Sequence, residues 1–437
     1  MSVYEKICAL AEGMEDQLIA TRRDFHKHPE TCWAEMRTTS LIARRLKDLG
    51  YELVLGHDVC HPEGRLGVPS QEILDNAYQR AEQQGADPEF LPYTKGGMTG
   101  VIGILRCGEG PTVGMRFDID ALPVAETKDP GHFPAEKGFA SINEGAMHAC
   151  GHDGHAAMGL GVAEILVAIK EHLHGTVKLI FQPAEEGVRG AKPMVEKGHL
   201  DGVDFLLGSH IDKRPAGEPN VSLIPASYGA LATRKYDVYY HGLAAHAGAL
   251  PHLGKNALLA ASAAVLNLNA IPRHGDGASR INVGKFIAGA GLNVIADEAY
   301  MGLEVRGATT EINEYMIEYA EKILDNCADM YGCTCEKVIV GAAEGMDSDL
   351  DFAEDIRTTC REQLGMSVSD TLTTLSFGSE DFSFMMNRVQ KNGGKATFMR
   401  CLADIKSVAH NDHFDFSEDC MVNGVKAFCG VAAKLMQ

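Results

Sequence analysis

The chain has 437 residues, and 45% of them are hydrophobic, so it can form two or three domains with buried cores. Its 60 acidic and 40 basic residues leave a formal charge of -20, which argues against a nucleic-acid partner because no basic stripe can release counterions from phosphates. Residues 1–20 carry charges throughout, unlike a secretory signal or a membrane span. The 12 cysteines lack the spacing of a disulfide framework and favour reduced thiols and a cytoplasmic location.

The N-terminal part of the chain contains two predicted helices and a polar insertion. Apolar periodicity predicts helices over residues 3–27 and 34–49. Residues 56–97 are polar and contain one predicted helix, over residues 70–84. This insertion is either a surface excursion or part of the substrate site, and its composition leaves both interpretations open.

Polar side chains suited to metal binding follow three predicted strands. The strands are 112–116, 176–181 and 204–209, and they are followed by Asp120, by the pair Glu185 and Glu186, and by His210. Side chains at the carboxyl ends of strands lie where α/β proteins place their sites. Adjacent residues project in different directions, so one glutamate of the pair can bind a metal while the other handles a proton.

The segment MHACGHDGH, residues 147–155, precedes an apolar run with helical periodicity over residues 156–169. In an extended or irregular loop, Cys150 and His152 point the same way and Gly151 lets the backbone bend, so both can bind one ion. The alternative is a buried cysteine beside a core histidine at the start of a helix. This segment alone does not decide between the two interpretations. The metal site is favoured because the chain contains other candidate ligands.

A different pattern begins near Gly229. The predicted elements are a strand at 234–240, a helix at 255–271, strands at 279–287 and 293–305, a helix at 311–330 and a strand at 334–340. This β-α-β-β-α-β order predicts a ferredoxin-like unit over residues 229–341, inserted between residues 1–228 and 342–437 of a larger α/β domain.

The larger domain then resumes. Its predicted elements are a helix at 347–364, the segment SFGSEDF at 376–382, a strand at 396–402 and a last helix from Ser417. His410 lies on a loop, residues 409–416, between the last two.

Eight motifs together resemble the aminoacylase, carboxypeptidase G and amino-acid-conjugate amidohydrolase family of dinuclear metallopeptidases. In chain order they are RRDFHKHPE, DIDALP, MHACGHDGH, FQPAEEG, GLAAHAG, NVI, GSEDF and a late HND segment. NVIA replaces the common NVIP at Ala296, and HND replaces HSP, but neither change removes a candidate ligand. The insertion also resembles the extra segment of family members that hydrolyse aminobenzoyl-glutamate. The resemblance implies an α/β catalytic domain with a central mixed sheet flanked by helices, and a dimerisation and lid domain.

The resemblance also implies a role for each site residue. The implied metal ligands are Cys150, His152, Glu186, His210 and His410. Glu185 resembles the general base, and Asp120 the carboxylate that orients a ligand. Three residues of the inserted unit complete the set: His246 resembles a histidine that enters the active site of the partner chain, and Asn293 and Arg306 resemble binders of the substrate carboxylate. Without the resemblance, His246 is an ordinary surface histidine.

The implied reaction is metal-dependent hydrolysis of the amide bond of an N-acyl amino acid. The resemblance favours aminobenzoyl-glutamate, which yields aminobenzoate and glutamate, and the alternative is a broader N-acyl-amino-acid amidohydrolase or dipeptidase. It implies two divalent ions per subunit, with Mn²⁺ favoured and Zn²⁺ as the alternative, because the mixed ligands suit both. It also implies a homodimer, with or without a related second subunit.

Two other classes of protein use some of the same residues. A non-catalytic metal-binding protein would keep the ligands but would not need a free carboxylate at Glu185. A cysteine hydrolase would use Cys150 with His152, although a nucleophile and its base normally converge from distant segments. Reversible loss of activity on metal chelation distinguishes the metalloenzyme from the thiol mechanism.

Overall fold

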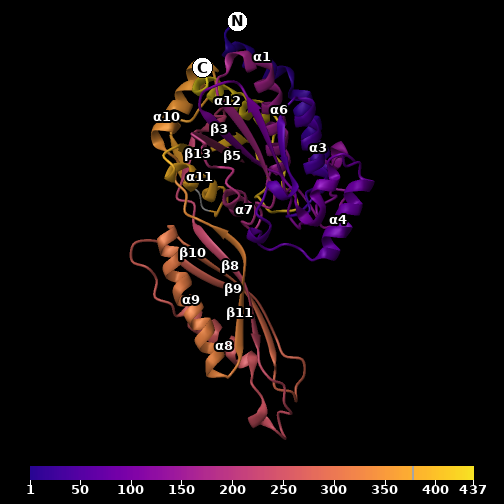
Figure 1. Ribbon diagram of the computed structural model, residues 1–437, viewed down its shortest axis with the longest axis vertical. Coiled ribbons are helices and arrows are strands. Elements are labelled where there is room, and N and C mark those ends of the chain that lie inside the picture. Colours follow the sequence, from indigo (N-terminus) through magenta and orange to yellow (C-terminus); the bar gives the residue numbers. More distant parts are fainter. Residues whose placement is uncertain (376–377) are drawn as a thin grey trace.

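The computed structural model describes residues 1–375 and 378–437 (Figure 1). The molecule is elongated and has two units: a larger one that carries both termini, and a smaller one built from the middle of the chain. No helix within the described residues is long and apolar enough to cross a membrane.

The larger unit is built on a seven-stranded mixed sheet with the order β1-β2-β4-β3-β5-β13-β6. Strands β2 and β6 run opposite to the other five. The strands are β1 (Glu52–Leu55), β2 (Val101–Arg106), β3 (Thr112–Asp118), β4 (Thr176–Gln182), β5 (Phe205–Lys213), β6 (Leu223–Ile224) and β13 (Lys395–Ala403). A separate two-stranded sheet pairs β7 (Ala226–Tyr228) with β12 (Thr373–Leu375).

Helices flank this sheet, which confirms the expected α/β fold with a central mixed sheet. One face packs against α1 (Val3–Gly13), α2 (Glu15–Lys27), α3 (Met36–Asp48), α6 (His152–Ala168), α10 (Leu350–Thr358) and α12 (Cys420–Leu435). The other packs against α7 (Ala191–Glu196) and α11 (Phe382–Lys391). The short α5 (Phe133–Lys137) lies in a loop. Within the insertion, α4 (Gln71–Gln83) packs on α3 of the larger unit.

Helix α6 is buried along nearly its whole length, which explains why its sequence is apolar on all sides. A Cβ atom at Gly159 would lie 2.6 Å from the Phe181 ring, so only glycine allows this close approach of helix and sheet. The packing holds the N-terminus of α6 at the edge of the sheet where β3, β4 and β5 end.

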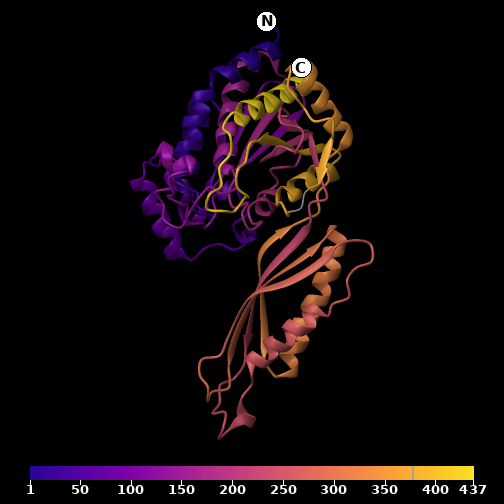
Figure 2. The same cartoon turned by 180° about the vertical axis from the view of Figure 1, so that it is seen from behind.

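The smaller unit has the β-α-β-β-α-β order. Its elements are β8 (Ala232–His241), α8 (Ala257–Asn269), β9 (Ser279–Ala288), β10 (Glu298–Gly307), α9 (Thr310–Met330) and β11 (Thr334–Ala343). They form an antiparallel sheet with the order β11-β8-β10-β9, the arrangement of a ferredoxin-like unit. Both helices cover one face, and the other face carries no helix of this unit (Figure 2).

Two predicted elements outside the site differ clearly from the structure. The helix predicted over residues 3–27 is two helices, because the first ends at Gly13 and Met14 leaves helical geometry while its side chain packs in the core. The strand predicted over residues 293–305 begins only at Glu298. Residues 293–297 instead form the end of a loop, which apolar composition does not distinguish from a strand.

Candidate active site and metal centre

Helix α6 begins at His152, and not at Ala156 as apolar periodicity predicted. Gly151 precedes it with φ 94°, in the left-handed region that favours glycine, so the chain turns sharply between Cys150 and the helix. His152 therefore lies in the first helical turn, as in the alternative interpretation, and the expectation that Cys150 and His152 share an extended or irregular loop is wrong. Periodicity missed this turn because its buried residues are polar.

The structure brings the five predicted ligands together with Glu185. Three groups have side-chain ligand atoms within 4.8 Å of one another: Cys150 with His152 and His210, Cys150 with Glu186 and His410, and His152 with Glu185 and Glu186. Cys150 Sγ lies 3.3 Å from His210 Nε2, and His410 Nε2 lies 3.5 Å from Glu186 Oε1. Cys150, His152 and Glu186 each belong to two of these groups, so the three groups form one continuous cluster.

The five candidate ligands come from four parts of the larger unit, because Cys150 and His152 share the segment at the start of α6. His210 lies inside β5, whereas the sequence placed it directly after a shorter strand, yet its ring still lies at the cluster. The backbone N–H of His410 donates to the Ala149 carbonyl over 2.8 Å, which ties the late loop to the segment before α6. His410 itself has φ 65°, an uncommon conformation for a residue other than glycine.

Hydrogen bonds on the outer side of two histidines point their other nitrogen into the cluster. Nδ1 of His210 donates to the Ile211 carbonyl over 2.7 Å, and Nδ1 of His152 donates to the Asp120 carbonyl over 2.9 Å. Among the described residues, the buried His152 Nε2 and Glu186 Oε1 atoms have no hydrogen-bond partner. Buried polar atoms normally have one, so these atoms fit a bound metal ion.

Asp120 organises the turn that carries the two glutamates. Its carboxylate accepts the backbone N–H groups of Glu185 and Glu186 over 3.1 and 2.9 Å. It also accepts the thiol of Cys32 over 3.3 Å. Ala184 begins the turn with φ 53°, a strained conformation for alanine. The predicted orienting carboxylate thus contacts His152 and both glutamates.

Glu185 is buried beside other carboxylates. Burial, followed by the charges of Glu380 and Glu186, raises the pKa of Glu185 well above its usual range. Burial also raises the pKa of Glu186, to about 7. A divalent cation in the cluster would lower both pKa values. A carboxylate whose pKa lies nearer neutrality can both accept and return a proton.

Asp118 and His155 also belong to the site. The sequence offered His155 as a ligand or as a group that supports one, and Asp118 as one of the carboxylates after a strand, but it gave neither a definite role. Asp118 accepts from His155 Nδ1 over 2.5 Å and from Arg116 Nη1 over 2.6 Å. His155 Nε2 accepts a backbone N–H of β5 over 2.8 Å. Their polar atoms are engaged, so they brace the site and leave little free for a metal. Two signals in the sequence could have identified their roles: Asp118 lies two residues before Asp120, and His155 lies one helical turn after His152.

Two further carboxylates come from the GSEDF motif, in which the sequence singled out no residue. Glu380 and Asp381 have carboxylate oxygens within 4.8 Å of Glu185, and Glu380 pairs with Arg116 over 3.0 Å. Burial raises the pKa of Asp381 to about 8. The first two residues of the predicted segment, 376 and 377, lie outside the described residues.

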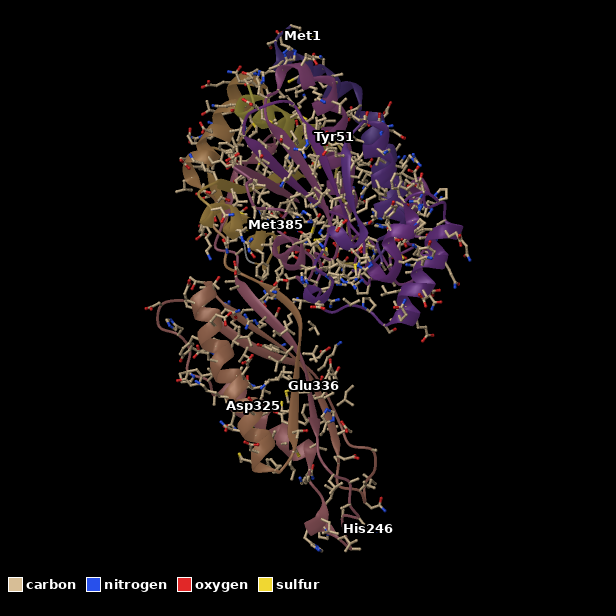
Figure 3. The ribbon with its side chains drawn as sticks, in the orientation of Figure 1. Met1, Tyr51, His246, Asp325, Glu336 and Met385 are labelled. Atoms are coloured by element: carbon tan, nitrogen blue, oxygen red, sulfur yellow. The ribbon has the colours of Figure 1, made fainter. Side chains whose placement is uncertain are left out.

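His246 and Asn293 lie side by side at the far tip of the smaller unit, away from the larger unit (Figure 3). His246 is exposed, and its Nδ1 accepts two backbone N–H groups of its own turn over 3.1 Å. Arg306 lies at the opposite end of β10, where its Nε is 2.9 Å from Glu304. A single chain therefore does not bring His246 and Asn293 to the metal ligands.

The insertion extends to the edge of the site. The Trp33 indole donates to the Leu66 carbonyl over 2.8 Å, and Arg189 donates to the Gly67 carbonyl over 3.2 Å. Arg189 follows the Glu185–Glu186 turn closely in sequence. The insertion thus contacts the segment after the candidate base, and its role in binding substrate stays a prediction.

Comparison with known proteins identifies relatives along the whole chain. The family described as Peptidase family M20/M25/M40 matches residues 114–434. The chain is 42% identical to the indole-3-acetyl-aspartic acid hydrolase of Enterobacter agglomerans, over 93% of this chain and 92% of the relative. It is 40% identical to one subunit of the p-aminobenzoyl-glutamate hydrolase of Escherichia coli, over 98% of both.

Solved structures agree with these relatives. The aminobenzoyl-glutamate utilization protein from Klebsiella pneumoniae has a TM-score of 0.83 and 36% identity, over 97% of each chain. A protein from Bacillus subtilis described as a dinuclear metal binding peptidase of the M20 family shares the fold, with a TM-score of 0.64, 24% identity, and coverage of 97% and 99%. The resemblance found in the motifs is thereby confirmed. The chain belongs to peptidase family M20/M25/M40 and is a hydrolase of amide bonds.

Proposed function

We propose that the protein hydrolyses the amide bond of N-acyl amino acids, with aminobenzoyl-glutamate as its substrate and aminobenzoate and glutamate as products. The observation that carries this proposal is Glu185, a buried carboxylate beside a converged set of five metal-type ligands. Two relatives that match over more than nine-tenths of this chain are named for amides of aspartic acid and of glutamic acid. A purely structural metal site would not need a base in this position.

The cluster fits two divalent ions per subunit, and we favour Mn²⁺ over Zn²⁺ from the family resemblance. The residues that would hold them are Cys150, His152, Glu186, His210 and His410. Thiolate, imidazole and carboxylate together suit several first-row metals. When bound, such ions lower the pKa of water and polarise a carbonyl group.

The protein's own groups then move the proton and hold the substrate. Glu185 takes the proton from the attacking water and returns it to the amide nitrogen as the carbon–nitrogen bond breaks. Asp120 keeps Glu185 in place through its backbone N–H. Arg306 gives up its ion pair with Glu304 and pairs with the substrate's α-carboxylate instead. His246 and Asn293 of a second chain complete the site, and His246 donates to the carbonyl oxygen.

The second chain is supplied by a homodimer formed through the smaller unit. Strand β9 is an edge strand, and unpaired edges invite pairing with another chain. Large apolar side chains are exposed on or beside α8 and β9: Leu259, Leu266, Phe286, Ile287 and Leu292. Hinges near residues 226–230 and 341–345 would let this unit close on the substrate. The Escherichia coli relative is named as one subunit of its enzyme, so a related second subunit is the alternative partner.

Turnover of a panel of N-acyl amino acids tests the proposal directly. We expect aminobenzoyl-glutamate to have the highest kcat/KM, and we expect chelation to abolish turnover until Mn²⁺ is added back. Product release is measured by chromatography. A general preference for dipeptides would contradict the substrate assignment, and full activity after exhaustive chelation would contradict the metal mechanism.

Replacing Cys150 with serine should weaken metal binding, because a thiolate ligand is lost while Glu185 and the other ligands remain. Burial raises the pKa of the Cys150 thiol, so without a metal it is a poor nucleophile. We expect a lowered metal content, measured by elemental analysis, and partial recovery of activity in excess metal.

The partly exposed Cys107, on the loop after β2, supplies the control, since Cys107→Ser should retain both metal and activity. An inactive Cys150→Ser protein at full metal occupancy would support the thiol mechanism instead.

A further inference from the structure

Arg400 lies beside a candidate metal ligand. It belongs to β13, which pairs with β5 in parallel, and its register partner is His210. Register partners in neighbouring strands point to the same face of a sheet, so the two side chains are neighbours. The positive charge of Arg400 acts on His210, and the negative charges of Asp212 and Glu380 act on Arg400. A guanidinium group therefore lies at the edge of the metal cluster.

This arginine differs from two other buried arginines in its partners. Those two are held by carboxylates at 2.6 to 3.4 Å: Arg22 by Asp153, Asp415 and Glu418, and Arg116 by Asp118, Glu380 and Asp381. Arg400 donates from Nε to the Ser227 hydroxyl over 2.8 Å. Its nearest carboxylate among the described residues, the half-exposed Asp212, is 3.7 Å from Nη1, too far for a hydrogen bond.

Arg400 is buried, and among the described residues no carboxylate lies within hydrogen-bonding distance of its guanidinium group. A buried charge normally has a paired counter-charge. The Arg400 side chain keeps 10% of its surface exposed, so a ligand can approach it.

We propose that Arg400 binds the side-chain carboxylate of an acidic amino acid in the substrate, and that it makes the enzyme select aspartate or glutamate conjugates. This inference rests on the proposed function. Such a substrate carries two carboxylates, and Arg306 can pair with only one of them. The two Nη atoms of Arg400 form a planar fork that matches a carboxylate. Two relatives that are at least 40% identical to this chain are named for a conjugate of an acidic amino acid.

A pair of substrates that differ in one charge tests Arg400. Aminobenzoyl-glutamate and aminobenzoyl-glutamine have nearly the same shape, and only the first carries the side-chain carboxylate. We expect the wild-type enzyme to prefer the glutamate compound and Arg400→Met to reduce the ratio of the two kcat/KM values by about 10- to 100-fold, the worth of hydrogen bonds to a charged group. Steady-state kinetics of both proteins on both substrates provide the ratio.

Three further variants separate the explanations. Arg306→Met should lower kcat/KM on both substrates alike. Arg388→Met, which removes a surface arginine paired with Asp201, should leave the ratio unchanged. Lys235 is another cation, on the uncovered sheet face of the smaller unit, and a loss of preference in Lys235→Met but not in Arg400→Met would overturn the proposal.

Other outcomes are equally decisive. An equal loss on both substrates in Arg400→Met, at normal metal content and with an unchanged circular dichroism spectrum, would assign Arg400 a structural role and overturn the proposal. If Arg400→Met does not fold, Arg400→Lys keeps the charge but loses the fork, and it should weaken inhibition by glutamate and not by glutamine. A wild-type enzyme that cleaves both substrates without preference overturns this inference alone, whereas one that cleaves neither overturns the proposed function.

Discussion

Replacing Glu185 with glutamine is expected to lower kcat by roughly a hundredfold or more while the protein keeps its metal ions. Glutamine has the same shape but cannot accept a proton from water. The backbone N–H at position 185 still donates to Asp120, so the turn should keep its conformation. Steady-state kinetics and elemental analysis of the same preparation measure the two properties.

The neighbouring glutamate is the matched control. Glu186 Oε1 lies 3.5 Å from His410 Nε2 and has no hydrogen-bond partner among the described residues, so Glu186→Gln should lose metal. If Glu185→Gln lost its ions and Glu186→Gln kept them, the roles that we assign to the two glutamates would be reversed.

Replacing His246 with alanine is expected to cost roughly a hundredfold or more in kcat, the usual effect of removing a hydrogen-bond donor to a developing oxyanion. The side chain lies at the tip of the smaller unit, and its Nδ1 is bound to its own turn, which leaves Nε2 free (Figure 3). In the role that we propose for it, His246 would reach a metal site in another chain. We therefore expect mixtures of inactive His246→Ala and inactive Glu185→Gln chains to recover activity.

The recovered activity has a defined size. With free exchange of equal amounts, half of the dimers are mixed and each has one site with both Glu185 and His246, so about a quarter of wild-type activity should return. Exchange of chains between dimers is followed by native mass spectrometry with tagged chains. The exposed His252 of the same tip serves as a control, because His252→Ala should remain active. No recovery despite demonstrated exchange would exclude a shared site, and a monomer at working concentration would exclude the dimer.

Most of the regular structure could be predicted because burial imposes a period on the sequence. Alternation along β10 and apolar periodicity in α9 predicted the order of the smaller unit, since each element buries one side against the same core. The errors fall where local signals are weak or absent. Helix α6 begins with buried polar residues, and the strand predicted from residue 293 starts at Glu298 because its first residues form a loop.

The five ligand candidates could be predicted because ligand chemistry restricts residue types, and their motifs occur in a recognisable order. The residues that brace them could not be assigned in the same way. Asp118, His155 and Glu380 are common residue types, and their roles depend on contacts with Arg116, Asp118 and a backbone N–H of β5. Except for the pair Arg116 and Asp118 within β3, these contacts connect segments that are far apart in the chain.

The sequence by itself therefore determined the class of fold, the order of strands and helices in the smaller unit, and the residue types that could bind metal. Only the tertiary structure decided that Arg400 is the neighbour of His210, because the parallel register of β5 and β13 is set by packing of the whole sheet. Only the tertiary structure also placed His246 at the far tip of the smaller unit. The physical reason is that periodicity reports which side of an element is buried, whereas the partner across the core depends on every element that packs around it.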